Sequence, residues 1–485
     1  MSWILNLAYL LLLVVVSPVI GYRMLIHGKY RDGWRQKLLG RLPRRGSTRP
    51  CLWFHAVSVG EVLQLRTIVT ELHPRLSRHD IVITTTTVTG LSIAREKFPG
   101  TRYRVCYFPL DFSWAVRRAL QRIRPSAVVL VELELWPNFI LTAQQMGVPL
   151  VLVNGRISSN SYRGYCRIRP LMKRLLGCFS ALAVQNETYR RHLVDLGAPE
   201  DRVSVTGSIK FDGLETDRHN PKTDEIRRSF AIGDRQRVLI AGSTQPPEEE
   251  CALETWLVLQ REFPDLRLIL VPRHKERFEE VAALVQSRGL SLVRRSSFRD
   301  RSICESQAVS VRSEVRRPGL NHPQHTISPT QAESRCSPHP SSILHPPSSP
   351  PPVLLLDTLG ELSACWGLAD VAFVGGSLTN RGGQNMIEPA AFGAAVLFGP
   401  NTWNFRDVVE LLLSENAARV VHNREQLTQT VHALLADPDA AARQGEIAQQ
   451  LVLSQQGATK KTIELVLGLL RETESRSAAT NSWAA

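Results

Sequence analysis

The sequence lacks cysteine pairs at zinc-ligand spacing and lacks a recognition helix, although its charge is strongly basic. The 59 Lys and Arg residues outnumber the 45 Asp and Glu residues, which gives a formal net charge of +14. A positive net charge favours anionic partners, which include nucleic acid, anionic lipids and phosphorylated substrates. Because no nucleic-acid-binding motif accompanies the charge, we expect no nucleic-acid partner.

The sequence also lacks a disulfide framework. Its eight cysteines are scattered over 485 residues, and most lie in apolar runs such as RLLGCFSAL. Such residues are typical of reduced thiols in the core of a cytosolic protein. The length exceeds what one hydrophobic core usually holds, so we expect two domains.

Charge is absent from Trp3 to Tyr22, a stretch of 20 residues that is long enough to span a bilayer. A cleaved signal peptide is the alternative, but no basic segment precedes the stretch and no convincing small-x-small site follows it. Residues 23–45 carry eight Lys and Arg residues against one acid, Asp32. By the positive-inside rule we expect residues 1–22 to be a single membrane anchor, with the body of the protein on the cytoplasmic side. Interfacial insertion without a full span stays open, because Pro18 interrupts the run.

Short apolar runs alternate with helical patterns from Cys51 to about Leu214, and the alternation restarts near Arg237. Continuous apolar strands that alternate with helices are typical of a parallel sheet covered on both faces. We therefore predict an α/β fold with two doubly wound, Rossmann-like domains that face a cleft, over residues 23–215 and 216–473. In such sheets ligands bind beyond the carboxyl ends of the strands.

One segment breaks this alternation. Residues 294–352 contain ten of the 29 prolines, many serines and few large apolar residues. This composition cannot bury enough surface to offset the entropy of ordering, so we predict a disordered insertion in the second domain. We expect the tail, residues 474–485, to be disordered as well.

Three stretches of the second half end strands with groups suited to an anion. GSTQPPEEE (Gly242–Glu250) offers hydroxyls at a helix start and is a candidate anion site, although the stretch by itself favours ordinary helix capping. VPRHKERF places Arg273 after a buried strand, where it suits a phosphate or simply faces solvent. GGSLTNRGGQNMIEPAAFG joins a Gly-rich loop, whose N–H groups can approach a phosphate, to Glu388, whose carboxylate can take both hydroxyls of a ribose.

The first half offers carboxylates and one lysine at strand ends. Glu61 ends CLWFHAVSVGE, where it is either an acid in the first turn of a helix or a base held in a cleft. Glu132 and Glu134 in VELELWPN form a carboxylate pair if the strand continues, and a solvated strand end otherwise. Lys210 in TGSIKFD is either a surface lysine or a cation that neutralises a leaving phosphate.

The order of these motifs resembles one family closely. HAVSVGE, ELWPN, NGRIS, TGSIKFD, PRH, DTLGEL, FVGGSL and GG-x-N-x-x-E-P follow one another as in bacterial Kdo transferases, which move 3-deoxy-D-manno-octulosonic acid (Kdo) from CMP-Kdo to a lipid A precursor. The resemblance covers roughly residues 1–295 and 353–473. It implies a GT-B architecture with an acceptor-binding N-domain and a donor-binding C-domain, inversion at the anomeric carbon, no metal and no cofactor. It also implies work on an anionic lipid at the inner membrane, which agrees with the anchor and its basic collar.

The resemblance also implies roles for residues at matching positions. Glu61 corresponds to the catalytic base, and Glu132 and Lys210 correspond to residues that assist the transition state. The positions that match CMP contacts are Pro272, Arg273, Leu359, Gly360, Glu361, Asn385, Met386, Ile387 and Glu388. Two positions depart from the family, because Gln245 and Gln384 stand where histidine is expected, which removes any imidazolium charge near a phosphate.

Two other classes of function remain as alternatives. A different GT-B transferase or a nucleotide-sugar epimerase with a UDP-linked sugar would share the Gly-rich loop and Glu388, but it would not explain HAVSVGE together with ELWPN. A membrane-anchored lipid-binding scaffold would need the anchor and the basic collar but no nucleotide. Release of CMP from CMP-Kdo separates a Kdo transferase from the first alternative, and binding of CMP excludes the second.

Overall fold

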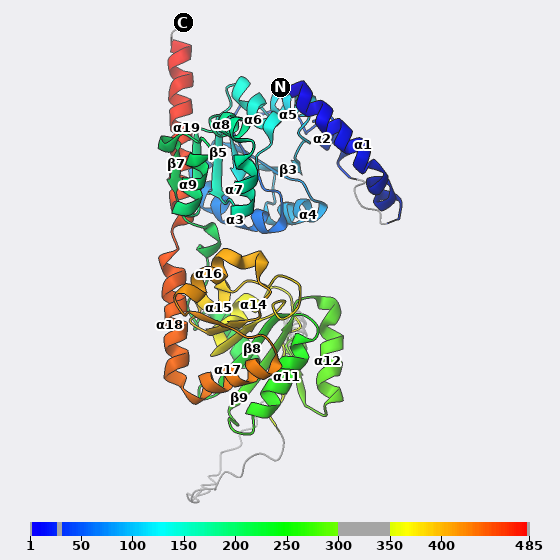
Figure 1. The fold of residues 1–485 in the computed structure, drawn as a ribbon, viewed down its shortest axis with the longest axis vertical. Coiled ribbons are helices and arrows are strands. Elements are labelled where there is room, and N and C mark those ends of the chain that lie inside the picture. Colours follow the sequence, from blue (N-terminus) through cyan, green and yellow to red (C-terminus); the bar gives the residue numbers. More distant parts are fainter. Residues whose placement is uncertain (1, 27–31, 299–349, 483–485) are drawn as a thin grey trace, which may run out of the picture. The chain divides into compact units, whose positions relative to one another are not determined.

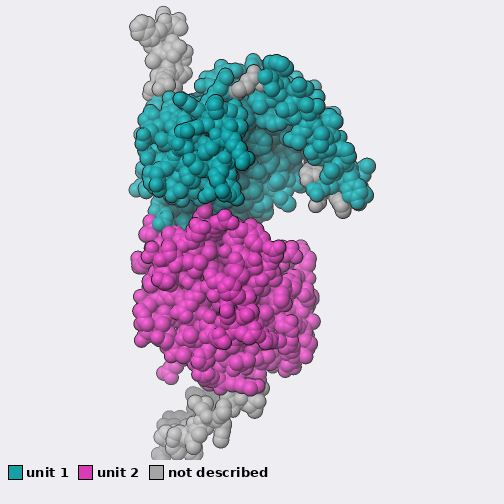
Figure 2. Space-filling model, viewed as in Figure 1, with its two compact units in different colours: residues 1–213, 455–485 teal, residues 214–454 magenta. Residues whose placement is uncertain are grey.

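The computed structural model describes residues 2–26, 32–298 and 350–482. The chain forms two compact units, drawn in different colours in Figure 2. Unit 1 comprises Met1–Gly213 and Gln455–Ala485, and unit 2 comprises Leu214–Ser454. Each unit contains one seven-stranded sheet in which the paired strands run parallel, with helices packed on it (Figure 1). The predicted α/β fold with two doubly wound domains is therefore confirmed.

The sheet of unit 1 has the strand order β3-β2-β1-β4-β5-β6-β7. The order reverses between β1 and β4, which makes this the switch point where ligands bind in doubly wound sheets. The strands are β1 (Cys51–His55), β2 (Asp80–Thr85), β3 (Tyr103–Tyr107), β4 (Ala127–Val131), β5 (Leu150–Gly155), β6 (Ala181–Val184) and β7 (Val203–Val205).

Helices of unit 1 cover both faces of this sheet, because the strands are apolar on both sides. Trp53, Val128 and Phe139 belong to the core on one face, and Phe54 and Val129 belong to the core on the other. The helices are α1 (Ser2–Ile26), α2 (Trp34–Lys37), α3 (Val59–Leu72), α4 (Val88–Lys97), α5 (Ser113–Ile123), α6 (Pro137–Gln145), α7 (Ser159–Cys166), α8 (Arg169–Leu176), α9 (Glu187–Asp195) and α19 (Ala458–Ser482).

The sheet of unit 2 has the order β10-β11-β9-β8-β12-β13-β14, so its switch point lies between β8 and β12. Its strands are β8 (Arg237–Thr244), β9 (Leu266–Pro272), β10 (Leu292–Arg294), β11 (Val353–Leu355), β12 (Val371–Val374), β13 (Ala395–Phe398) and β14 (Ala418–Val420). Its helices are α10 (Pro221–Ser229), α11 (Glu248–Leu259), α12 (Phe278–Ser287), α14 (Leu362–Cys365), α15 (Ile387–Ala391), α16 (Arg406–Ser414), α17 (Arg424–Ala436) and α18 (Pro438–Ser454).

The C-terminal helix α19 differs from the sequence prediction in two ways. Its residues Ile463, Val466 and Leu470 complete a core of unit 1, together with Val62 and Leu65 of α3. The second unit therefore ends at Ser454 rather than at residue 473, because the apolar face of α19 is buried on the first sheet. Helix α19 also continues to Ser482, into the tail predicted to be disordered, because no proline or glycine interrupts it there.

The predicted insertion, residues 294–352, is shorter at both ends than its composition suggests. Arg294 is the last residue of β10, and Arg295 is buried and ion-paired. Pro350, Pro351 and Pro352 lead directly into β11. The predicted insertion began at these two arginines because they are charged, but both form ion pairs within unit 2, Arg294 with Asp357 and Arg295 with Glu361. Residues 299–349, on which the rest of this prediction falls, lie outside the described residues.

Helix α1 is long and apolar enough to cross a membrane, and Pro18 lies within it without ending it. Two polar side chains near its start contact the body of unit 1. The amide of Asn6 donates to Ser113 Oγ at 2.7 Å, and its oxygen accepts from the Ser113 N–H at 3.0 Å. The hydroxyl of Tyr9 donates to Asp111 Oδ2 at 3.0 Å. The first turns of the predicted anchor are therefore fixed to the start of α5.

Candidate active site

Glu61 lies in the first turn of α3, immediately after the central strand β1. Its carboxylate accepts the N–H of Val57 at 2.8 Å and the N–H of Ser58 at 3.2 Å, and Ser58 Oγ accepts the N–H of Glu61 in return. This reciprocal capping box agrees with the interpretation of Glu61 as an acid in the first turn of a helix. The side chain is nonetheless buried at the carboxyl edge of the sheet. Burial raises the pKa of Glu61, the charge of Glu132 acts in the same direction, and the two N–H groups oppose the shift.

Two more carboxylates follow the neighbouring strand β4, across the switch point from Glu61. Glu132 has a φ of 59°, a left-handed conformation that is costly for a residue with a side chain and is common at functional sites. Because the strand ends at Val131, Glu132 and Glu134 do not form the strand-face pair that their spacing suggested. Burial raises the pKa of Glu134 to about 7, with further increases from the charges of Glu61 and Glu132. The charge of Glu132 therefore raises the pKa of both Glu61 and Glu134.

Lys210 lies in a short 3-10 helix, Ile209–Phe211, that follows β7. The N–H of Ile209 donates to Asn154 Oδ1 at 3.2 Å, and the amide of Asn154 donates to Gln64 Oε1 of α3 at 2.7 Å. Asn154 is fully buried and has a φ of 55°. This residue joins the segment of Lys210 to the helix of Glu61, and the sequence analysis did not single it out. Its signal was the Asn-Gly pair at a strand end, since asparagine tolerates this conformation better than most residues.

Three N–H groups at the start of the Gly-rich loop after β12 are engaged within the protein. Glu248, the first residue of α11, is fully buried and its two oxygens accept four N–H groups. The donors are Gln245 at 2.9 Å, Gly376 at 2.6 Å, Ser377 at 2.9 Å and Leu378 at 2.9 Å. The N–H groups of Gly376, Ser377 and Leu378 are thus satisfied by an internal carboxylate, so the predicted phosphate contact concerns the later residues of the loop. The contact between the Gln245 N–H and Glu248, in the first turn of α11, agrees with the helix-capping interpretation of GSTQPPEEE.

Glu388 lies in the first turn of the short helix α15, and its carboxylate accepts the amide of Asn385 at 2.9 Å. Burial raises the pKa of Glu388, while the Asn385 amide and the charge of Arg273 lower it. Both Met386 and Ile387 are buried, so only their main chains could contact a ligand.

The remaining predicted nucleotide contacts follow β9 and β11. Pro272 is the buried last residue of β9, whereas Arg273 is exposed. After β11, Leu359 is 67% exposed and Gly360 has a φ of +82° with open space around it. The carboxylate of Glu361 is paired with Arg295 at 2.9 Å, so it is engaged within the protein. This loop therefore offers its main chain rather than an acidic side chain.

The two glutamines that depart from the family pattern lie at the same loop. The N–H of Gln245 donates to Glu248, which also holds the N–H of Gly376. A Cβ placed on Gly376 would come within 3.1 Å of Gln384 Nε2. Gln245 and Gln384 thus both lie near Gly376, at the carboxyl edge of the second sheet.

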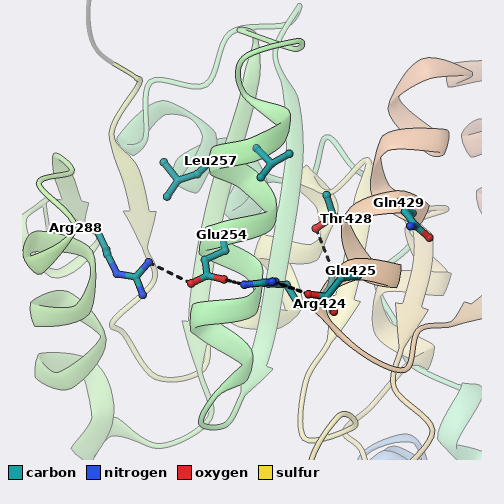
Figure 3. Close-up of a pocket in the computed structure, with 8 residues that line it drawn as sticks. Glu254, Leu257, Arg288, Arg424, Glu425, Thr428 and Gln429 are labelled. Atoms are coloured by element: carbon teal, nitrogen blue, oxygen red, sulfur yellow. Dashed lines mark hydrogen bonds and ion pairs between the residues drawn. The ribbon is translucent and has the colours of Figure 1, made fainter.

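A separate hollow of about 620 Å³ lies on unit 2, away from these loops (Figure 3). Its cations are already paired, Arg288 with Glu254 at 3.3 Å and Arg424 with Glu425 at 2.6 Å. We therefore do not assign this hollow to an anionic substrate. Within the described ranges, no cluster of three or more His, Cys, Asp or Glu side chains could hold a metal ion.

Comparisons with known proteins agree on one family. Residues 32–213 match the family model described as 3-deoxy-D-manno-octulosonic-acid transferase (kdotransferase). A 3-deoxy-D-manno-octulosonic acid transferase of Haemophilus influenzae is 28% identical over 464 residues, which cover 94% of this chain and 97% of that protein. The protein of the same name from Bordetella pertussis is 29% identical over 469 residues and also covers 94% of this chain and 97% of its own length.

A solved structure shares the fold. The UDP-GlcNAc 2-epimerase from Neisseria meningitidis bound to UDP-GlcNAc superposes with a TM-score of 0.52 at 11% identity, covering 86% of this chain and 100% of that chain. At this identity the likeness concerns the two-domain GT-B architecture alone. The family model over residues 32–213 and the near full-length relatives reach further: the chain is similar to 3-deoxy-D-manno-octulosonic acid transferases over nearly its whole length and is a glycosyltransferase.

Proposed function

We propose that the chain transfers Kdo from CMP-Kdo to a lipid A precursor, with inversion at the anomeric carbon and release of CMP. The observation that carries the proposal is the placement of Glu61, a buried carboxylate at the switch point of unit 1 with the family motif HAVSVGE around it. The switch point is where doubly wound sheets bind their ligands.

In the proposed step, Glu61 acts as the general base. Its carboxylate takes the proton of a sugar hydroxyl of the acceptor, the hydroxyl oxygen forms a bond to C2 of Kdo, and the bond from C2 to the phosphate oxygen breaks. CMP leaves with that electron pair as a phosphate monoester. Burial raises the pKa of Glu61, which makes its carboxylate a stronger base than that of an exposed glutamate.

Charged neighbours support this step. Lys210 supplies a positive charge that can offset the negative charge on the leaving phosphate and on the carboxylate of Kdo itself. Glu132 is held in a strained conformation beside the switch point, which fits a residue whose carboxylate must point in one direction.

We assign the donor to unit 2. Arg273 is exposed and available to the phosphate, and the main chain of Leu359–Glu361 is open to the nucleotide. Glu388, oriented by Asn385, takes the two hydroxyls of the ribose. Because Glu248 occupies the first part of the Gly-rich loop, we assign the phosphate to the later residues, near Asn385.

We assign the acceptor to unit 1 and to the membrane. Helix α1 and the basic residues 23–45 suit an anionic lipid surface, so we place the protein at the cytoplasmic face of the inner membrane.

The decisive experiment incubates the purified protein with CMP-Kdo, generated in situ, and a tetraacyl lipid A precursor. Mass spectrometry of the lipid should show the added mass of one or more Kdo residues. Calorimetry with CMP and UDP separates the alternatives, because binding of UDP alone would indicate another nucleotide-sugar enzyme.

A further inference from the structure

Arg295 is a buried cation that no step of the proposed reaction uses. It follows β10 directly and its side chain is 2% exposed. A guanidinium is almost never buried to this extent unless all its neighbours are arranged to pair with it. Its partners therefore indicate what the buried charge holds in place.

The guanidinium of Arg295 donates two hydrogen bonds to the carboxylate of Glu361. Nε donates to Glu361 Oε2 at 3.3 Å, and Nη2 donates to Glu361 Oε1 at 2.9 Å. The same side chain donates to Ser229 Oγ of α10 at 2.6 Å and to the carboxylate of Glu225. A two-point contact fixes orientation as well as distance, so Glu361 is held against α10 in one geometry.

The residues on either side of Arg295 hold the opposite end of the same loop. Arg294 Nε donates to Asp357 Oδ2 at 2.7 Å. Ser296 donates to Asp357 through its N–H at 2.8 Å and through its hydroxyl at 2.6 Å. Three consecutive residues, Arg294–Ser296, therefore fix both ends of the loop Asp357–Glu361.

The middle of this loop is open while its ends are fixed. Thr358 donates to Glu361 within the loop, Leu359 is largely exposed, and Gly360 adopts a positive φ with nothing around it. Both carboxylate oxygens of Glu361 accept hydrogen bonds within the protein, so this side chain stabilises the conformation of the loop. A loop that presents its main chain binds well only if its conformation is fixed in advance, because ordering it on binding would cost affinity.

We propose that Arg295 is a positioning residue that holds the loop Asp357–Glu361 in its nucleotide-binding conformation. This inference rests on the proposed function, because it takes the loop to contact CMP. It assigns to a residue outside every motif of the family resemblance a role in donor affinity, exerted through Glu361.

The test compares CMP binding and steady-state kinetics of wild type, Arg295→Met, Arg295→Lys and a control, Arg288→Met. Arg288 lies in the same unit and pairs with two glutamates, but its partners are on α11, away from the loop. Arg295→Met should weaken CMP about tenfold or more, the size expected for a lost hydrogen bond to a charged group. It should raise KM for CMP-Kdo more than it lowers kcat. Arg295→Lys should recover part of the affinity, and the control should stay within about twofold of wild type.

A second variant separates loss of CMP affinity from loss of folding. Arg295→Met leaves the carboxylate of Glu361 unpaired, and the double variant Arg295→Met with Glu361→Leu removes that charge too. The double variant should regain the melting temperature and still bind CMP weakly, because the loop has lost its anchor. Affinity within twofold of wild type in either variant would overturn the inference alone. No CMP binding by the wild-type protein would instead overturn the proposed function, and this inference with it.

Discussion

Glu61 combines two roles that a single substitution can separate. Glutamine at this position of a capping box still reaches the N–H groups of Val57 and Ser58, but it cannot accept a proton from a hydroxyl. We expect Glu61→Gln to lower transfer by about 10²–10⁴-fold, the usual contribution of a general base. CMP affinity and melting temperature should stay near wild type.

The control for this variant is Glu61→Ala, which removes the cap as well. It should lose the same activity and, in addition, lower the melting temperature. A rate for Glu61→Gln above one tenth of the wild-type rate would rule out Glu61 as the base.

The raised pKa of Glu134 predicts that the melting temperature of the protein depends on pH. Its pKa is raised to about 7 in the folded protein, so its protonated form is favoured by folding. The stabilising contribution is complete below the ordinary pKa of a glutamate, near 4.5, and is lost as pH rises through about 7. Glu134→Gln should therefore change the melting temperature little at pH 5 and raise it at pH 8. Calorimetry at both pH values checks the sign, and equal effects at both would show that Glu134 does not titrate in this range.

Glu248 is the acid on which the Gly-rich loop depends. Glu248→Ala removes the acceptor of four buried N–H groups, each worth about 1–3 kcal/mol when it is left unsatisfied. We expect unit 2 to lose several kcal/mol of stability in urea unfolding. Glu250→Ala, on the same helix but paired with the half-exposed Arg288, should lose about 1 kcal/mol or less. Similar losses for the two variants would contradict this account.

At the residue scale, the sequence predicted positions better than partners. It placed Glu61, Glu132 and Lys210 at strand ends, because strand ends are visible in the apolar pattern. It could not predict that Glu248 binds the loop of Gly376, since the two are 128 residues apart. For the same reason it could not predict that Arg295, 66 residues away, binds the carboxylate of Glu361.

Helix α1 carries a prediction at the scale of elements. Asn6 accepts from the Ser113 N–H and from the Asn138 amide, whereas the hydroxyl of Ser17, another polar residue of α1, donates to the Val14 carbonyl within the helix. Asn6→Ala should lower turnover of a membrane-embedded acceptor several-fold, because the helix loses its fixed place on unit 1. Ser17→Ala should not, and removal of residues 1–22 should have at least the effect of Asn6→Ala. Turnover can be followed in vesicles, with CMP affinity as the reference, and unchanged turnover after the truncation would make α1 dispensable for access to the lipid.

Most of the strands were predictable from their apolar runs, and β3, β10 and β14 were not. The strand β3 reads YRVCY, in which the first three side chains are only partly buried, so no continuous apolar run marks it. The strands β10 and β14 have three residues each, too few to show a period. These strands owe their place to pairing with neighbours, which sequence patterns do not record.

At the scale of the whole molecule, the segment between β10 and β11 offers a sharp comparison. Replacing residues 299–349 with a short Gly/Ser linker should leave folding, CMP affinity and transfer largely unchanged, because their composition is poor in apolar residues. Replacing residues 294–352 should weaken CMP, because it also removes Arg294, Arg295 and Ser296. Calorimetric titration of both variants checks this, and loss of affinity in the shorter replacement would show that residues 299–349 contribute to the site.

The return of the chain to unit 1 has a consequence for biosynthesis. Most of unit 1 is translated before unit 2. Its core is completed only by Ile463, Val466 and Leu470, which the ribosome adds after all of unit 2. At about 5–20 residues per second, that interval is on the order of tens of seconds. During this time the apolar face of α3 that α19 will cover stays open, while unit 2 can already be complete. The part of the protein that is translated first is thus the last to mature, and a nascent chain in this state is the form most in need of a chaperone.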